Sequence, residues 1–78
     1  MKHINTAFEV APDDVETALA NIKQPVSEDA AQILFDKYIA PESDRIEKAA
    51  LWGNDMDQQT DYAHEEIVLI LKEAEAIK

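Results

Sequence analysis

The sequence predicts an all-α protein, a compact bundle of about four helices with a short extended N-terminal arm. Apolar residues recur at helical spacing over most of the chain, and only one glycine and three prolines interrupt its 78 residues. Each proline stands where a helix is expected to begin or end. Because domains usually hold roughly 100–150 residues, residues 1–78 are expected to form a single small helical domain.

Residues 1–11 are expected to form the arm. Apolar and β-branched residues fall on every second position there, which is the period of a strand. The residues on this side are Ile4, Thr6, Phe8 and Val10. A lone strand has no partner within the chain, so the arm should lie across the helices or pair with another molecule. A helical turn beginning at Asn5 is the alternative.

The first helix is predicted over residues 12–24. Pro12 suits the first helical position, and Asp13 and Asp14 follow it where the helix dipole favours acids. The apolar stripe of this helix consists of Val15, Ala18, Leu19 and Ile22. Pro25 should end the helix.

The second helix is predicted over residues 27–40, with Ser27 as its N-cap. Apolar side chains cover about half of its circumference, so we expect it to be the central and most buried helix. The side chains expected to be most buried are Leu34, Phe35, Tyr38 and, from the last helix, Ile67.

The third helix is predicted over residues 41–52, ending at Gly53 in the left-handed conformation that glycine supplies at helix C-termini. Asp55 and Gln58 have the spacing of a capping box and begin a fourth helix over residues 55–77. Loops of only a few residues should make consecutive helices antiparallel or sharply angled neighbours. So short a chain buries only about 60% of its unfolded surface, so self-association or docking onto a partner is expected.

The charge balance and the missing residue types exclude several classes of function. The chain has 17 acidic and 7 basic residues, a net charge of −10, which opposes direct binding to DNA or RNA. No run approaches the roughly 18 apolar residues of a membrane span, and the N-terminus lacks the apolar stretch of a signal peptide. The absence of cysteine excludes disulfides and thiolate chemistry. We therefore expect a cytoplasmic protein without a cofactor.

The most informative stretch lies between Gly53 and Glu66, where acids occur without any lysine or arginine. The acids are Asp55, Asp57, Asp61, Glu65 and Glu66. Asp57, Asp61 and Glu65 fall at i, i+4 and i+8, so they line one face of a helix and repel one another slightly. We name this row the acidic ridge. It is interpreted as a surface for a basic partner, and a solvated face of an acidic protein is the alternative.

Two metal-binding patterns in this stretch are incomplete. The acids that match a calcium-binding loop are Asp55, Asp57, Asp61 and Glu66. Thr60 stands where that loop needs a glycine. Asp61, His64 and Glu65 could face one cation, but three ligands within about one helical turn give poor geometry. We predict no metal site.

Four apolar or aromatic side chains exceed what a single core needs. Trp52 and Tyr62 lie off the apolar stripes of their helices and belong to residue types that are enriched at interfaces. Val68 and Leu69 belong to an apolar run that surrounds the last helix, and they are candidates for contact with a second copy of the chain. Packing within the chain is the alternative for all four.

No motif for catalysis is present, because the sequence has no glycine-rich phosphate loop, nucleophile elbow or paired histidines. We expect a protein that is not an enzyme. The expected partner-binding residues are Asp55, Asp57, Asp61, Glu65, Glu66, Tyr62 and Trp52.

The expected partner is a protein with a basic, nucleic-acid-binding or nuclease surface. The chain would inhibit it as a DNA mimic, in the manner of inhibitors, immunity proteins, antitoxins or phage anti-defence proteins. The alternative is a homodimeric helical adaptor or regulator. In that case Val68, Leu69 and Trp52 bury against a second copy, and the acidic charge serves only solubility.

Overall fold

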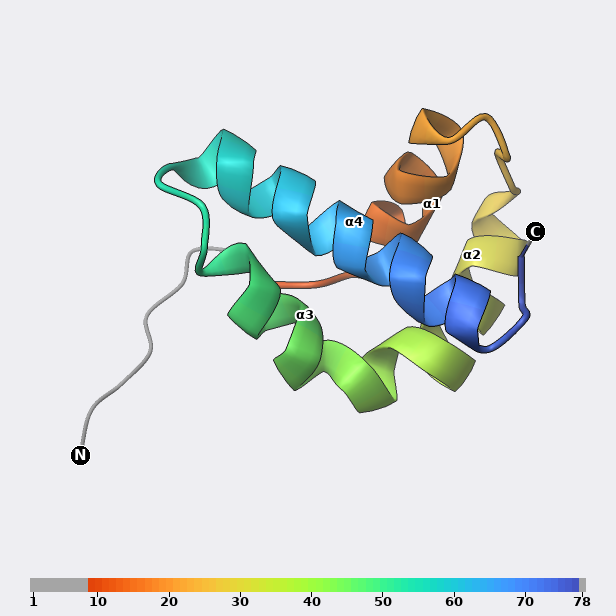
Figure 1. Cartoon of the computed structure of the whole chain (residues 1–78). Helices are drawn as coiled ribbons and strands as arrows, with labels where there is room; N and C mark the ends of the chain where they lie inside the picture. The colour runs from red at the N-terminus through yellow and green to blue at the C-terminus, as the bar shows by residue number, and fades with distance from the viewer. Residues whose placement is uncertain (1–8, 78) are drawn as a thin grey trace.

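Helices account for most of residues 9–77, the part of the chain that the computed structural model describes (Figure 1). The α-helices are α1 (Pro12–Asn21), α2 (Glu28–Leu34), α3 (Ser43–Ala50) and α4 (Met56–Glu73). Between α2 and α3 lie a π-helix, η1 (Phe35–Ile39), and a 3-10 helix, η2 (Ala40–Glu42). No strand occurs in residues 9–77, so the all-α fold class is confirmed. Most of the predicted arm, residues 1–8, lies outside the described residues.

Asp14 and Ser27 fix the beginnings of the first two helices. The Ala11 N–H donates to the Asp14 carboxylate at 2.8 Å, and the Asp14 N–H donates to the Ala11 carbonyl at 2.9 Å. Ahead of α2, Ser27 Oγ accepts the Ala30 N–H at 3.1 Å, as predicted for an N-cap. These bonds satisfy groups that the ends of a helix leave without a partner.

Asp55 begins α4 by accepting the Gln58 N–H at 2.9 Å through its carboxylate. In a capping box, the Gln58 side chain would in turn accept the N–H of the capping residue. Here its Oε1 accepts the N–H of Asn54, one residue earlier, at 2.8 Å. Asp55 is therefore the N-cap of α4 as well as a residue of the predicted binding surface.

α1 ends at Asn21, earlier than the proline spacing predicted. Lys23 has a left-handed backbone, with φ of 64°, and its N–H donates to the Ala20 carbonyl at 3.0 Å. The Gln24 N–H donates to the Leu19 carbonyl at 2.8 Å. These two bonds make the Schellman arrangement, which usually contains glycine at the left-handed position. Because the residue at this position is a lysine and not a glycine, the sequence did not indicate that the helix ends here.

No loop separates α2 from α3, which corrects the predicted boundary at Ala40 and Pro41. The backbone stays helical through η1 and η2, so residues 28–50 form one helical stretch that changes direction (Figure 1). The Ala40 N–H donates to the Phe35 carbonyl, five residues back. This wider turn makes room ahead of Pro41, whose ring would clash with a regular α-helical turn. The described residues therefore hold three helical stretches instead of the predicted four, and α2 and α3 are not antiparallel neighbours.

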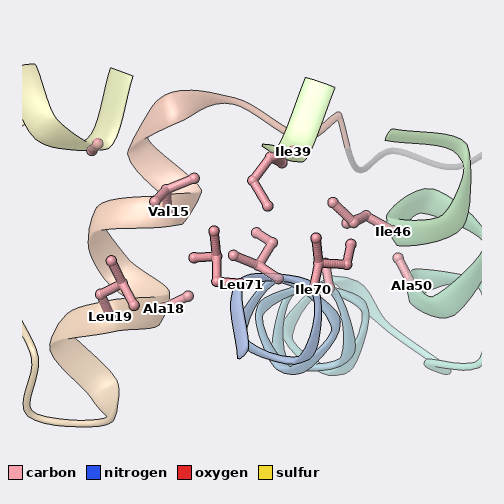
Figure 2. Packing of buried hydrophobic residues seen from close by; sticks show 11 residues of the cluster. Val15, Ala18, Leu19, Ile39, Ile46, Ala50, Ile70 and Leu71 are labelled. Carbon is pink, nitrogen blue, oxygen red and sulfur yellow. The ribbon is translucent and has the colours of Figure 1, made fainter. Parts of the chain in front are cut away.

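α4 is the central helix of the core, although the helix predicted over residues 27–40 was expected there. α4 packs against both α1 and α3, and Figure 2 shows the buried side chains of these helices converging. The buried core residues are Val15, Ala18, Leu19, Ala31, Ile39, Ile46, Ala50, Ala63, Ile67, Ile70 and Leu71.

α2 lies at the edge of that core. Ile67 of α4 is fully buried, as predicted, but Leu34, Phe35 and Tyr38 are only half-buried against the core. Ile33 is 63% exposed. α2 has only seven residues and packs mainly against α1. Its apolar side chains on the other sides of the helix therefore remain partly exposed. The prediction that it would be the most buried helix was therefore wrong.

Gly53 is required for close packing and not for a left-handed turn. α3 ends at Ala50, and Gly53 has no positive φ, so the predicted glycine stop is wrong. A Cβ at Gly53 would lie 2.5 Å from the Gln59 nitrogen and 2.7 Å from the Gln58 carbonyl carbon. Only a residue without a side chain lets the turn after α3 approach the first turns of α4 this closely.

Leu71→Ala should lower the free energy of unfolding by about 2–5 kcal/mol, because Leu71 is fully buried and its truncation leaves a cavity. Leu69→Ala is the matched control on the same helix. Leu69 is 49% exposed, so the same substitution should cost less than about 1 kcal/mol. Urea unfolding followed by circular dichroism measures both, and equal costs would contradict the placement of α4.

Gly53→Ala should lower the free energy of unfolding by about 1–3 kcal/mol, because the added methyl group meets the backbone of α4. Asn54→Ala provides the control in the same turn. Asn54 is exposed and keeps its backbone N–H for Gln58, so its substitution should change stability by less than about 0.5 kcal/mol. Thermal melts of the two variants make the comparison, and a neutral Gly53→Ala would show that the turn does not pack as described.

Candidate functional site

The acidic ridge stands on the surface of α4. Asp57, Asp61 and Glu65 are all exposed, and their side chains form no hydrogen bond or ion pair with residues 9–77. Asp57 lies in the first turn of α4, where the helix dipole stabilises a carboxylate. Asp61 and Glu65 lie beyond that turn, so within the described part of the chain their charges are balanced by nothing but solvent.

A hollow of about 430 Å³ lies beside the ridge, between the end of α3 and α4. It is lined by Ala49, Trp52, Tyr62, Glu65, Glu66 and Leu69, and we name it the aromatic hollow. Trp52 is 82% exposed, and Tyr62 and Leu69 are exposed as well. The structure therefore brings together both aromatic residues, two of the acids and one apolar residue that the sequence analysis singled out. Asp55, Asp57 and Asp61 lie outside this lining.

Val68 and Leu69 do not share a surface, although the sequence analysis grouped them. Val68 is half-buried against the core and lines a second hollow, between α1 and α4. Leu69 lies in the aromatic hollow. Consecutive residues on a helix are rotated by about 100°, and here this rotation assigns them to different sides of α4.

Arg45 of α3 neutralises Glu66, one of the predicted partner-binding residues, and Glu73. Its guanidinium donates to Glu66, and to both carboxylate oxygens of Glu73 at 3.1 and 3.2 Å, while Glu42 lies 4.0 Å away. The hydrogen bonds that Arg45 donates to Glu73 and Glu66 raise the pKa of Arg45 above its ordinary value, and they lower the pKa of Glu73. The side chain of Glu66 is only 18% exposed, whereas the acids of the ridge are exposed. Glu66 borders the hollow, but its charge is engaged by Arg45.

His64 is buried, and its partner is an acid of α1 and not one of the neighbouring acids of α4. It is 7% exposed, and its Nε2 lies 3.0 Å from Asp14 Oδ1 of α1. Asp14 thus uses one carboxylate oxygen for the start of α1 and the other for α4. This contact joins two helices that are distant in sequence, which periodicity along one helix cannot reveal.

Neither metal-binding pattern is assembled in the described residues. Residues 56–73 are helical, so the acids of the calcium-loop pattern are spread along α4 and cannot surround one ion. Within residues 9–77, no three histidine, aspartate or glutamate side chains are grouped as metal ligands. The His64 ring is instead held by Asp14.

Comparison with known proteins identifies no relative of this chain, so its function has to be argued from its own surface. No family model, no curated protein and no solved structure matches the chain. Of the helices in the described residues, none is both long enough and apolar enough to cross a lipid bilayer. The features that could serve recognition are the acidic ridge and the two hollows that border it.

Glu73→Gln should destabilise the protein at neutral pH and lose this effect in acid. Arg45 lowers the pKa of Glu73 below the ordinary 4.5 in the folded state, so the ionised carboxylate contributes stability above that pH. The contribution is lost as the pH falls through the folded-state pKa. Urea unfolding between about pH 7 and pH 3 should show the difference between wild type and variant shrinking toward zero.

Glu75→Gln is the control for that series, because it removes one carboxylate close by without removing a partner of Arg45. Its use matters because the protein carries a net charge of −10, and acid also relieves general repulsion. A difference for Glu73→Gln that stays constant with pH would contradict the ion pair.

Proposed function

We propose that the chain is a small acidic binding module that occupies a basic surface of another protein and blocks it. The observation that carries the proposal is that the acidic ridge reaches the aromatic hollow at Glu65, which lines it. Glu65, an exposed carboxylate without an ion-pair partner in residues 9–77, stands in the same lining as an exposed tryptophan and tyrosine. Charge complementarity favours a basic partner, and Trp and Tyr are residue types that carry much of the binding energy at interfaces.

The two features have different roles in binding. The ridge, with the net charge of −10, attracts a basic surface over a distance and accelerates the encounter. The aromatic hollow supplies apolar contact once the surfaces meet, with Trp52 and Tyr62 as anchors and Leu69 beside them. Arg45 does not compete with the partner for the ridge, because it is bound to Glu66 and Glu73.

A nucleic-acid-binding or nuclease surface is the partner class that this charge pattern fits best. Such surfaces carry lysine and arginine arranged to neutralise successive phosphates. Carboxylates at i, i+4 and i+8 of α4 repeat along the helix at about 6 Å, four times the rise per residue. A row of carboxylates along a helix can occupy the groove in which the partner otherwise binds the phosphate backbone of a nucleic acid. The chain would then inhibit by exclusion, without a chemical step.

Neutralising the ridge should weaken partner binding at least tenfold, which corresponds to about 1.4 kcal/mol. The variant carries Asp57→Asn, Asp61→Asn and Glu65→Gln. The control carries Asp36→Asn, Asp44→Asn and Glu75→Gln, which remove the same charge from exposed positions that line neither hollow. The ridge variant should unfold within about 0.5 kcal/mol of wild type, since relief of repulsion along the ridge offsets the loss of Asp57 at the helix N-terminus.

The measurement begins with the immobilised wild-type chain, which captures its basic partner at low salt. The affinity of wild type, ridge variant and control for that purified partner is then determined at two salt concentrations, and the partner is assayed for nucleic-acid binding or cleavage with and without the chain. The proposal requires salt-dependent binding that the ridge variant loses, together with inhibition. If wild type, ridge variant and control bind the partner with equal affinity, the ridge takes no part in binding and is only a solvated surface. A self-associating chain without such a partner would favour the homodimeric adaptor, in which Trp52 and Leu69 bury against a second copy.

A further inference from the structure

A second hollow, of about 300 Å³, lies on the other side of the acidic ridge, between α1 and α4. Its lining is Ala18, Asn21 and Ile22 of α1 with Asp61, His64, Glu65 and Val68 of α4. We name it the α1–α4 hollow. Glu65 borders both this hollow and the aromatic hollow, whereas Asp61 lines only the α1–α4 hollow.

The walls of the α1–α4 hollow combine apolar surface with unneutralised negative charge. Ala18 is buried, and Ile22 and Val68 are half-buried against the core, which makes this part of the wall apolar. Asp61 and Glu65 are exposed, and their side chains have no ion pair with residues 9–77. A ligand that fills the hollow therefore needs an apolar stem and a cationic end.

His64 makes this hollow a preformed feature. Its ring is buried and bound to Asp14 across the interface of α1 and α4, and Asp14 is bound in turn to the Ala11 N–H. The two helices that form the walls are thus joined by a hydrogen bond at the hollow itself. A ligand does not have to open or order this site, which reduces the cost of binding.

Arginine fits the hollow better than lysine. Its guanidinium is planar, offers five donors and can bind two carboxylates at once, whereas an ammonium is a compact and strongly hydrated charge. Carboxylates at i and i+4, such as Asp61 and Glu65, come from positions whose Cβ atoms lie about 5–6 Å apart on one helix face. That spacing suits a fork of donors, and the methylene stem of arginine can lie against Ile22 and Val68.

We propose that the α1–α4 hollow is a socket for one arginine side chain of the basic partner. The guanidinium binds Asp61 and Glu65, and the stem contacts Ala18, Ile22 and Val68. This inference rests on the proposed function for its source of the arginine, but the socket is a property of this chain and can be tested without the partner.

The test is an NMR titration of the isotope-labelled chain with three small probes of similar size: the N-acetyl methylamides of arginine, lysine and citrulline. Citrulline keeps the shape of arginine without its charge. The arginine probe should shift the amide signals of residues 18–22 and 61–68 in a saturable way in the millimolar range. The lysine probe should bind several-fold more weakly, and the citrulline probe should cause no saturable shifts.

Asp61→Asn combined with Glu65→Gln should weaken the arginine probe at least fivefold. Asp57→Asn combined with Asp44→Asn is the control, because it removes the same charge from exposed positions that do not line the hollow. These substitutions preserve side-chain size, and the dispersion of each amide spectrum reports whether the variant remains folded. Equal effects of the two double variants, equal binding of lysine and arginine, or shifts spread over the whole acidic surface would overturn the socket.

The socket and the proposed function can fail separately. If the arginine probe fails to bind while the ridge variant still loses the captured partner, the socket is wrong and the ridge proposal stands. If the probe binds as described but no basic partner depends on the ridge, the socket is real and the proposed function is wrong.

Discussion

The burial of α4 between α1 and α3 is the interaction on which the rest of the structure depends. A helix of 18 residues has to supply apolar surface to two neighbours that do not cover each other. Ile67 and Leu71 are fully buried as a result. The part of the α4 surface that neither neighbour covers is exposed to solvent, and the acidic ridge lies on it. The two hollows follow from the same geometry, since each lies along the seam between α4 and one of these helices.

Arg45 separates the acids of α4 into two groups. Arg45 gathers Glu66 and Glu73 into a network that links α3 to α4, and these acids support the fold. The acids of the ridge have no such partner in residues 9–77. Because an exposed ion pair contributes little and is screened by salt, the network cannot stabilise the fold by much. Its clearer effect is to neutralise Glu66 and Glu73, while the three carboxylates of the ridge keep their charge without an ion pair in residues 9–77.

Features that depend on a few neighbouring residues were predictable from the sequence. Ser27 and Asp55 cap their helices as expected, and the ridge follows from helical spacing alone. The end of α1 was not predictable, because Lys23 adopts a conformation that its residue type rarely takes. Pro41 was misleading for a related reason: a wider turn ahead of it lets the helix continue.

Features that depend on packing between helices could not be read from the sequence. The bond between His64 and Asp14 joins residues 50 positions apart, and no local pattern marks it. The meeting of Trp52 with Tyr62 in one hollow requires the packing of α3 on α4. The sequence thus identified most of the side chains of the candidate site, while the folded chain decided which of them share a surface.

The contact of Gly53 with the first turns of α4 has a consequence for Trp52, the residue just before it. A tryptophan on a free loop would have to lose backbone freedom at the moment of recognition, which weakens affinity. Here the turn packs on α4 in the folded chain, so the backbone of Trp52 is already fixed before a partner binds. Only the side-chain torsions of the indole then have to be ordered on binding. The contribution of Trp52 to binding affinity should therefore depend on the rigidity of the turn as much as on the area that its ring buries. The absence of a side chain at one position is what gives its neighbour a defined orientation.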